Sequence, residues 1–548
     1  VMFSRQALVG RTVSALRIVN LILERIIKVL NFTNLLVEIK PQIKLSAKWR
    51  FLRNIVKPLI GPLIFLILTI APPLPLVIEA ASSSNAFLPK APQIALGALI
   101  WVASWWVLEV IPLGLTGLLA ALLFSSLGFV SLSDALRSFT DPIIWVFIGG
   151  FVLAKAFQVW GLDKRVALFV VNFYKGENPM LAALFTACLP AFLLTATGSI
   201  TASASVVYPI VLSYLSLVKP SAKFSEAVML SLGEAATAGA LLLIISTPPN
   251  LVAKQVLEQQ VPGFKLTFLD WFILGTPQAI IGLLIAWLVV FKVLGVKERV
   301  RPLLETIEVE KNFSRRMNFG EKLVVLVFII TLALWLIPGI LLIASSLNPE
   351  ISPLAELTAK LLPEAAPAVL AVLLLGLLRV ERRPLLTFEE ISRGIDWNVV
   401  FLFGGGIAMG KGLDASGFSK WLALLITSSG FELNEFSLST IGALMGFAIT
   451  FPASNTASAI VTVPLVASIS KGAGINPIAP VIATALACSI SSALPSTTPP
   501  MAIVYGSGMV KMKNMIKVGL LADTLRLALL VLTEPFLVDF LLRIKGIP

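Results

Sequence analysis

Stretches of about 20 apolar residues recur from residue 55 to residue 543, and they limit what this chain can fold into. Each stretch is long enough to cross a bilayer core of about 30 Å as a helix. The composition agrees, because 57% of the residues are hydrophobic and 13% are charged, against about 45–50% and about 25% in soluble domains. The alternating pattern of membrane strands, about ten residues each, is absent. The sequence therefore predicts an all-α polytopic membrane protein.

The basic residues gather at the N-terminus. Residues 1–57 hold eleven Lys and Arg against Glu24 and Glu38, which supplies 11 − 2 = 9 of the 13 net positive charges. Basic segments mark the cytoplasmic side of membrane proteins. We therefore expect residues 1–52 to form a basic amphipathic segment on the cytoplasmic membrane face, with a targeting peptide as the alternative, and no nucleic-acid partner. The chain has no His, which excludes His-based catalysis, proton relay and metal ligation.

The two halves of the chain repeat one another. Asp141–Gly150 (DPIIWVFIGG) lines up with Asp396–Gly405 (DWNVVFLFGG) at an offset of 396 − 141 = 255. The hydroxyl-rich runs that begin at Thr195 and Thr450 repeat at 450 − 195 = 255, and the Thr-Pro-Pro elements repeat at 498 − 247 = 251. A nearly constant offset at three markers indicates a duplicated architecture.

We predict about 11 transmembrane helices plus two re-entrant hairpins, in a plasma (inner) membrane and with the N-terminus in the cytoplasm. With this topology the basic segments lie on the cytoplasmic side, as is typical of membrane proteins. This topology makes the two repeats inverted. The predicted parts are the N-terminal segment 1–52, a first transmembrane helix with its external loop at 53–92, the first inverted repeat 93–296, a cytoplasmic loop 297–322, and the second inverted repeat 323–548.

Each repeat carries two interrupted apolar segments. The predicted hairpins 179–216 and 436–470 turn at the hydroxyl-rich runs, and the predicted broken helices 224–260 and 478–511 break at Thr-Pro-Pro. Two adjacent Pro residues break a helix, and such a break survives in a membrane only where it is buried or lines an aqueous cavity. Interrupted segments at matching positions of two halves point to a transport site near the midplane. Helix N-termini there attract anions, and freed carbonyls with Ser, Thr and Asn oxygens suit Na⁺. A single Ser/Thr cluster is more typical of helix packing, but four clusters in two matched pairs favour a ligand site.

These residues resemble a known family. Ser454-Asn455-Thr456, its partial copy Ser199-Ile200-Thr201 and the two Thr-Pro-Pro loops look like the signature of the divalent anion/sodium symporter family, the dicarboxylate and sulfate carriers of the ion transporter superfamily. The resemblance covers roughly residues 50–545. It implies a homodimer in membrane lipid, with a scaffold and a moving transport domain that works as an elevator. It also implies that the chain is not an enzyme and that its substrate is a divalent anion such as succinate, malate or fumarate, coupled to Na⁺. A sodium-independent exchanger of di- or tricarboxylates, and a carrier of sulfate or another oxyanion, are the alternatives.

The resemblance also implies a set of site residues. It assigns the first sodium site to Thr195, Ser199 and the backbone near Ser246, and the second to Thr450, Asn455 and the backbone at Ala453 and Thr497. It assigns substrate binding to Ser199, Thr201, Thr247, Pro248, Asn455, Thr456, Thr498 and Pro499. None of these residues is charged, because two cations and helix N-termini can balance a dianion, whereas a buried Arg would be costly without a partner.

The sequence departs from the family pattern at a few positions. Ile200 stands where the family usually has Asn, which removes a donor to substrate and an oxygen ligand from the first sodium site, and Met501 stands where Asn is common. Glu234 lies in an apolar span, and ionisable residues there are functional candidates. We expect Glu234 to take part in coupling, as a proton carrier or as a replacement for a lost cation interaction; a carboxylate that faces the cytoplasmic end of its helix is the alternative. Asp523 and Arg526 are expected to pair at i, i+3.

Other functional classes fit less well. An intramembrane enzyme needs a Ser–His dyad, paired membrane aspartates or a metal motif, and the sequence shows none of these. An arsenite-type carrier does not fit the Ser-Asn-Thr tip, and a channel does not fit inverted repeats with hairpins. The chain has no Gly-Lys-Ser/Thr phosphate loop for ATP.

Overall fold

A computed structural model describes residues 47–546, apart from residues 85, 172, 175, 219, 301–315, 364, 429–432, 452–453 and 496. The described chain is helical almost throughout, and its strands are β1 (Arg379–Val380) and β2 (Arg383–Pro384), which pair antiparallel. Most of the predicted N-terminal segment 1–52 and of the predicted loop 297–322 lies outside the described residues. The protein is thus an all-α membrane protein, as predicted.

The described chain divides into two compact units. The first holds residues up to Ser138, Gly404–Leu433 and Lys471–Ile475. Its helix α4 packs against α2 and α5, and α20 packs against α3 and α4. The bounds of its elements, including those that cross into the second unit, are α2 (Ala47–Ile70), α3 (Val77–Ser83), α4 (Ala91–Leu108), α5 (Leu113–Ser126), α6 (Leu132–Arg137), η1 (Ser138–Thr140), α19 (Trp397–Ala415) and α20 (Phe418–Ser428).

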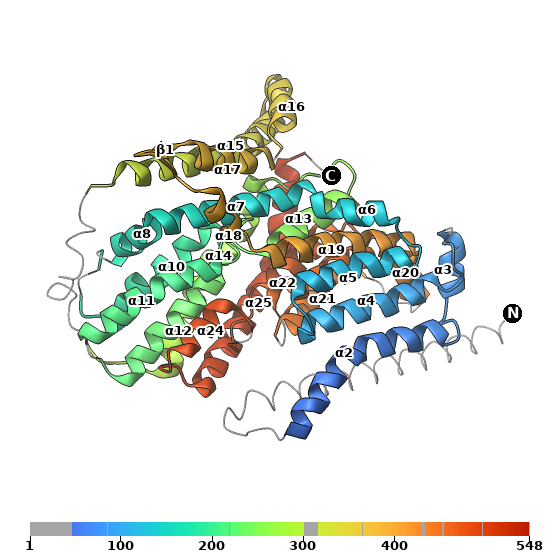
Figure 1. The fold of residues 1–548 in the computed structure, drawn as a ribbon, viewed down its shortest axis with the longest axis horizontal. Helices are drawn as coiled ribbons and strands as arrows, with labels where there is room; N and C mark the ends of the chain where they lie inside the picture. The colour runs from blue at the N-terminus through green and yellow to red at the C-terminus, as the bar shows by residue number, and fades with distance from the viewer. Residues whose placement is uncertain are drawn as a thin grey trace. The chain divides into compact units, whose positions relative to one another are not determined.

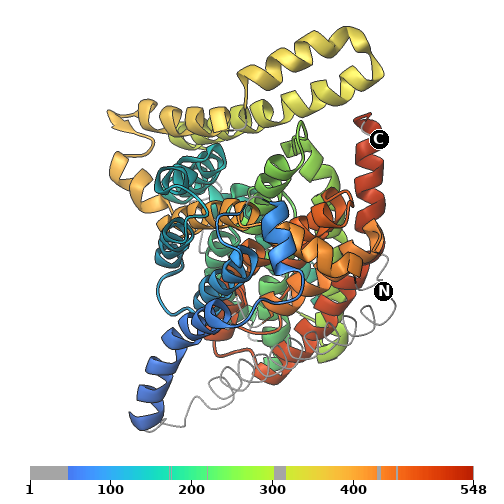
Figure 2. The same ribbon diagram turned by 90° about the vertical axis from the view of Figure 1, so that its right-hand side faces the viewer.

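The second unit holds Phe139–Phe403, Asn434–Ser470 and Asn476–Pro548, and Figures 1 and 2 show its helices α15 and α17 side by side. Its first elements are α7 (Pro142–Trp160), α8 (Leu162–Val171), α9 (Pro179–Ala183), η2 (Leu184–Cys188), α10 (Leu189–Leu194), η3 (Thr195–Thr197), α11 (Ile200–Val218), α12 (Ala222–Gly239), α13 (Pro248–Gln260) and α14 (Phe268–Leu294). The later elements are α15 (Phe319–Leu347), η6 (Pro349–Ile351), α16 (Ser352–Leu361), α17 (Ala365–Leu377), α18 (Phe388–Gly394), α21 (Glu435–Thr450), α22 (Asn455–Gly472), α23 (Ile478–Cys488), α24 (Pro499–Gly506) and α25 (Met512–Ile544).

Several helices are long and apolar enough to cross a membrane. Among the described residues five pass by length and composition: Ala91–Leu108, Leu132–Trp160, Pro179–Thr197, Phe268–Leu294 and Phe319–Ser345. The bent pair Ser352–Leu361 and Ala365–Leu377 would make a sixth. Shorter apolar helices cover other predicted spans, so the count of about 11 remains a prediction. The predicted inverted repeats, each of which has residues in both compact units, also remain a prediction.

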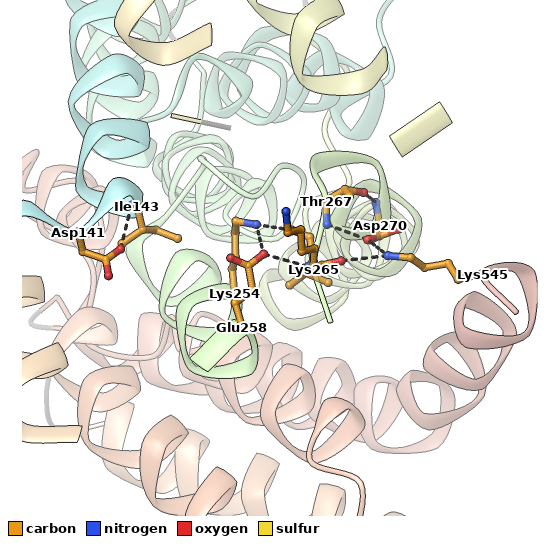
Figure 3. A network of polar contacts seen from close by, with 9 residues as sticks. Asp141, Ile143, Lys254, Glu258, Lys265, Thr267, Asp270 and Lys545 are labelled. Atoms are coloured by element: carbon orange, nitrogen blue, oxygen red, sulfur yellow. Dashed lines mark hydrogen bonds and ion pairs between the residues drawn. The ribbon is translucent and has the colours of Figure 1, made fainter. Parts of the chain in front are cut away.

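Side-chain caps begin several of the second unit's helices. Thr267 with Asp270 starts α14 and Asn318 with Glu321 starts α15, in each case as a reciprocal capping box that satisfies two free N–H groups. Asp270 also accepts a hydrogen bond of 2.6 Å from Lys545, so the end of α25 is held against the start of α14 (Figure 3). This ion pair gives the buried Asp270 carboxylate a half-buried Lys545 ammonium as its partner at one end of the unit.

The β1–β2 hairpin is joined to α18 by a charged contact. Glu390 accepts hydrogen bonds from the backbone and hydroxyl of Thr387, at 2.9 and 3.1 Å, and from Arg383 at 2.6 Å. Partial burial raises the pKa of Glu390, but these hydrogen bonds and the Arg383 charge together outweigh burial and hold its pKa below the usual range.

Candidate functional site

The second hydroxyl-rich run forms a tip between α21 and α22. The Thr450 hydroxyl, fully buried at the end of α21, lies 2.8 Å from Asn455 Oδ1 and 2.8 Å from the Cys488 carbonyl oxygen. Ser454 caps α22, because its hydroxyl accepts a hydrogen bond of 3.2 Å from the Ala457 N–H. A hydroxyl has a single proton, so the two oxygens near Thr450 compete for it. Three oxygens therefore converge on one buried point.

The oxygen and the nitrogen of the Asn455 side-chain amide have different surroundings. Its side chain is 6% exposed and opens α22, whose first N–H groups have no partner within the helix. Its Oδ1 contacts Thr450, whereas its Nδ2 is buried and makes no hydrogen bond with any described residue. A buried donor without an acceptor is costly, by about 1–3 kcal/mol. The amide thus offers an oxygen to a cation and an N–H to an anion.

The loop that faces this tip runs from Cys488, where α23 ends, to Pro499, where α24 begins. Thr498 is extended, and its hydroxyl is buried without a hydrogen bond to any described residue. Thr497 is turned inward instead, since its N–H and its hydroxyl both donate to the Leu494 carbonyl, at 3.2 and 2.7 Å. The Pro pair removes two helical N–H donors at the start of α24. The loop therefore presents a free hydroxyl at a helix N-terminus.

The first tip has the same backbone plan. Its Thr195 hydroxyl lies 2.9 Å from the Gly239 carbonyl at the end of α12, as Thr450 lies against Cys488, and 2.6 Å from the Phe192 carbonyl. Gly198 turns the chain with φ 102°, a conformation that favours glycine. Ser199 accepts a hydrogen bond of 3.1 Å from the Ala202 N–H and so caps α11. The two tips thus present a hydroxyl to the same kind of carbonyl.

The first tip differs from the second at Ile200. Ile200 lies at the position of Asn455, since 200 + 255 = 455, and its side chain is 9% exposed. An aliphatic side chain has neither the oxygen nor the N–H that the second tip provides. The next residue, Thr201, is exposed, whereas its counterpart Thr456 is half-buried. The first tip therefore lacks the polar contact between hydroxyl and amide that the second tip has.

The first loop, between α12 and α13, is closed by its own side chains. Asn250 Nδ2 donates to the Ala240 and Leu243 carbonyls, at 2.8 and 2.9 Å, and the Ser246 hydroxyl accepts from the Leu243 N–H at 3.2 Å. Met501 stands at the position of Asn250, since 250 + 251 = 501, and a thioether cannot donate. An Asn side chain thus occupies two carbonyls of the first loop, and the second loop has no such donor at that position.

A charged cluster lies against the second loop. Arg526 Nη1 is 3.0 Å from Glu234 Oε2 and 3.5 Å from Asp523 Oδ1, so the predicted Asp523–Arg526 pair is confirmed. The Ser492 hydroxyl lies 2.8 Å from Glu234 Oε1 and 2.7 Å from Asp523 Oδ1. Ser492 N–H donates to Asp523 Oδ2 at 2.8 Å. Glu234 is 1% exposed, so its carboxylate is enclosed among these partners.

The remaining predicted residues are placed as follows. Pro248 and Pro499 open α13 and α24, each after an extended Thr, Thr247 and Thr498. Ala453 lies outside the described residues. All of the predicted site residues that are described belong to the second unit, in which α11 packs against α24 and α13 against α23. No motif in the sequence marked Ser492 or the Gly239 and Cys488 carbonyls, because backbone acceptors and isolated serines carry no spacing signal.

The sequence of this chain is similar to that of known proteins. Residues 63–541 match the model of the sodium:sulfate symporter transmembrane region, which is most of the chain. The chain belongs to this family of symporters. The match confirms the resemblance drawn from the two tips and the Thr-Pro-Pro loops, and it makes the protein a member of a transporter family.

Curated proteins of similar sequence extend the comparison. The sodium-dependent dicarboxylate transporter SdcS of Staphylococcus saprophyticus is 29% identical over 467 residues, which cover 82% of this chain and 86% of that protein. The protein of the same name from Staphylococcus aureus strain USA300 is 29% identical over 482 residues, which cover 83% of this chain and 88% of that protein. The chain is therefore similar to these relatives over most of their length.

Proposed function

We propose that this symporter carries a C4-dicarboxylate such as succinate, malate or fumarate across a membrane together with Na⁺. The observation that carries the proposal is the second tip, where Thr450, Asn455 and the Cys488 carbonyl converge against the Thr-Pro-Pro loop. The names of the two staphylococcal relatives, sodium-dependent dicarboxylate transporters, agree with sodium-dependent transport of a dicarboxylate.

Na⁺ binds through the oxygens of the second tip and loop. The side-chain ligands are Thr450 and Asn455, and the backbone ligands are the carbonyls at Ala453 and Thr497. Neutral oxygens suit this cation, because it is hard and carries a single charge. To receive it, the Thr450 hydroxyl proton turns toward the Cys488 carbonyl, which leaves its lone pairs and Asn455 Oδ1 free.

The dianion binds on the opposite side of the same amide. Asn455 Nδ2 and the Thr498 hydroxyl are buried without partners, so a carboxylate that reaches them repairs two unmade hydrogen bonds. Ser199, Thr201 and Thr456 supply further hydroxyls, and Thr247–Pro248 and Thr498–Pro499 place helix N-termini near the ligand. Asn455 then contacts both ligands, which makes binding of the cation and of the anion mutually favourable.

The first tip takes a weaker part in coupling. Thr195, Ser199 and the backbone near Ser246 remain as ligands for Na⁺, but Ile200 supplies no oxygen and Asn250 already occupies loop carbonyls. For this reason sodium-independent exchange of di- or tricarboxylates is kept as a second candidate function. A carrier of sulfate or another oxyanion would use the same donors.

The wider architecture is proposed with the function. A homodimer of about 11 transmembrane helices and two re-entrant hairpins per chain, arranged as inverted repeats, moves its site across the membrane as an elevator. The carrier lies in the plasma membrane, and its N-terminus lies on the cytoplasmic side. Crosslinking in native membranes and accessibility of single Cys residues to impermeant reagents test these two statements.

Flux into proteoliposomes tests the function. Labelled succinate is offered with an inward Na⁺ gradient, with a proton gradient, or with unlabelled dicarboxylate inside and no ion gradient. We expect accumulation with the Na⁺ gradient and inhibition by malate and fumarate. Accumulation that needs only internal dicarboxylate and ignores Na⁺ establishes exchange instead, and inhibition by sulfate but by no dicarboxylate establishes the oxyanion carrier.

A further inference from the structure

Within the cluster of Glu234, Asp523, Ser492 and Arg526, the Ser492 hydroxyl meets two carboxylate oxygens with a single proton. The Ser492 hydroxyl lies within hydrogen-bond distance of one carboxylate oxygen of Glu234 and one of Asp523, at 2.8 and 2.7 Å. It has one proton to donate, and an ionised carboxylate has none. Only one of the two contacts is a hydrogen bond if both acids are ionised; the other brings two acceptors together. One additional proton on either acid makes both contacts favourable.

The charges of the cluster lead to the same count. Two carboxylates face a single guanidinium, and these three side chains are 1%, 0% and 4% exposed. A net charge of −2 + 1 = −1 is then left in the interior, where an uncompensated charge costs several kcal/mol. The buried thiol of Cys188 also lies close enough to Glu234 for an electrostatic interaction. The other partners of Arg526 are backbone carbonyls, those of Glu234 and Gly282 at 3.1 Å each.

We propose that Glu234 and Asp523 share one proton through Ser492, and that this symporter takes up and releases that proton during its cycle. The protonated acid donates to Ser492 Oγ, and Ser492 donates to the other acid, which pairs with Arg526. The cluster is then neutral, and both contacts of the Ser492 hydroxyl are hydrogen bonds. The proposal rests on the proposed function, to which it adds a proton as a second coupling ion.

The cluster is tied to the loop of the second tip. Ser492 lies between Cys488, whose carbonyl contacts Thr450, and Thr497, whose backbone is proposed to bind Na⁺. Its N–H donates to Asp523 at 2.8 Å, so the position of the loop depends on both acids. A cation on this loop favours the state in which both acids are ionised, because positive charge disfavours the proton. Binding of Na⁺ therefore releases the proton, and by reciprocity protonation weakens Na⁺ binding.

Infrared difference spectroscopy of the full chain in liposomes tests the shared proton without measuring transport. We expect the wild type to show the C=O stretch of a protonated carboxylic acid that disappears as the pH rises. Glu234→Gln and Asp523→Asn each leave one acid and one Arg526, which form a neutral pair, so each single variant loses this band. An amide also replaces the protonated acid as a donor to Ser492, so both variants are expected to fold.

Two buried glutamates serve as controls. Glu226 lies on the same helix, and each of its oxygens has its own donor, Lys511 N–H at 2.8 Å and Asn514 Nδ2 at 2.9 Å. Glu226→Gln is expected to leave the band unchanged. Glu534 is fully buried, and one of its oxygens has no partner among the described residues. A protonated Glu534 would absorb in the same region of the spectrum, and Glu534→Gln removes that contribution. When each is combined with Glu534→Gln, a band that persists in both Glu234→Gln and Asp523→Asn overturns the proposal, as does the absence of such a band from the Glu534→Gln variant alone.

Measurement of the Na⁺ dissociation constant at several pH values tests the linkage. One proton released per Na⁺ bound weakens Na⁺ binding by about tenfold for each unit of falling pH, once the cluster is protonated. We expect this slope in the wild type and its loss in Asp523→Asn. A slope that is unchanged in Asp523→Asn overturns the linkage. Failure of succinate uptake by the wild type would overturn the proposed function instead, and would leave the infrared result standing.

Discussion

Replacement of Asn455 by Ala tests the assignment of the second tip. The side chain is 6% exposed, its Oδ1 lies 2.8 Å from the Thr450 hydroxyl, and its Nδ2 has no partner among the described residues. Asn455→Ala removes one proposed oxygen ligand of Na⁺ and one proposed donor to the dianion. It leaves the backbone and the Thr450–Cys488 contact in place.

The expected loss can be worked out from these contacts. A hydrogen bond to a charged group contributes about 1.5–3 kcal/mol, and about 1.4 kcal/mol corresponds to a tenfold change in affinity. Loss of both contacts predicts apparent affinities for Na⁺ and succinate that are together weaker by about 100-fold or more. Folding stability changes less, by about 1–2 kcal/mol, because the variant also removes a buried donor that has no partner. Function is therefore lost in a protein that still folds.

Initial rates of succinate uptake over a series of Na⁺ concentrations, with thermal unfolding in detergent, measure the two effects. Ser439→Ala is the matched control, because Ser439 is buried on α21 and its hydroxyl donates within its own helix to the Glu435 carbonyl at 2.7 Å. Asn455→Asp separates the two ligands, since it keeps the oxygen for Na⁺ but repels the dianion. If Asn455→Ala transports succinate with the Na⁺ dependence of the wild type, the second tip is not the binding site.

Three further predictions follow from other parts of the second unit. Ile200→Asn restores an amide to the first tip, and we expect a steeper dependence of uptake on Na⁺ concentration; an unchanged Na⁺ response removes Ile200 from the coupling argument. Glu234→Gln combined with Asp523→Asn leaves Arg526 buried without a counter-charge, so thermal unfolding should report a loss of about 3–5 kcal/mol that neither single variant shows; equal stability of the double and single variants contradicts this reasoning. The pKa of Glu390 is lowered in the folded protein, so its contribution is present above the unfolded pKa and is lost as the pH falls through the folded pKa; hydrogen exchange in residues 379–394 should quicken there, and Glu390→Gln should abolish that pH dependence.

The sequence by itself determined the class of the protein and predicted where its site lies. Apolar stretches of bilayer length and low charge leave a helical membrane protein as the solution, and Pro-Pro pairs in apolar segments require broken helices. The observed breaks lie where the composition changes, at Thr195–Gly198 and between Gly239 and Pro248. The residue types of both tips predicted which tip lacks an amide. These features are local, because a short stretch of chain decides them.

The tertiary structure alone decided which groups meet. The Thr450 hydroxyl reaches the carbonyl of Cys488, 38 positions further along the chain. The Ser492 hydroxyl contacts both Asp523 and Glu234, and Glu234 lies 258 positions before Ser492 in the sequence. Backbone carbonyls are present at every residue, so no sequence pattern marks the one that accepts a hydrogen bond. The sequence left open whether Glu234 faces a cytoplasmic helix end, and the packing of α12 against α24 and of α23 against α25 enclosed it beside Arg526. Proton sharing in such a cluster depends on distances of a few ångströms between segments that are remote in sequence, and only folding sets those distances.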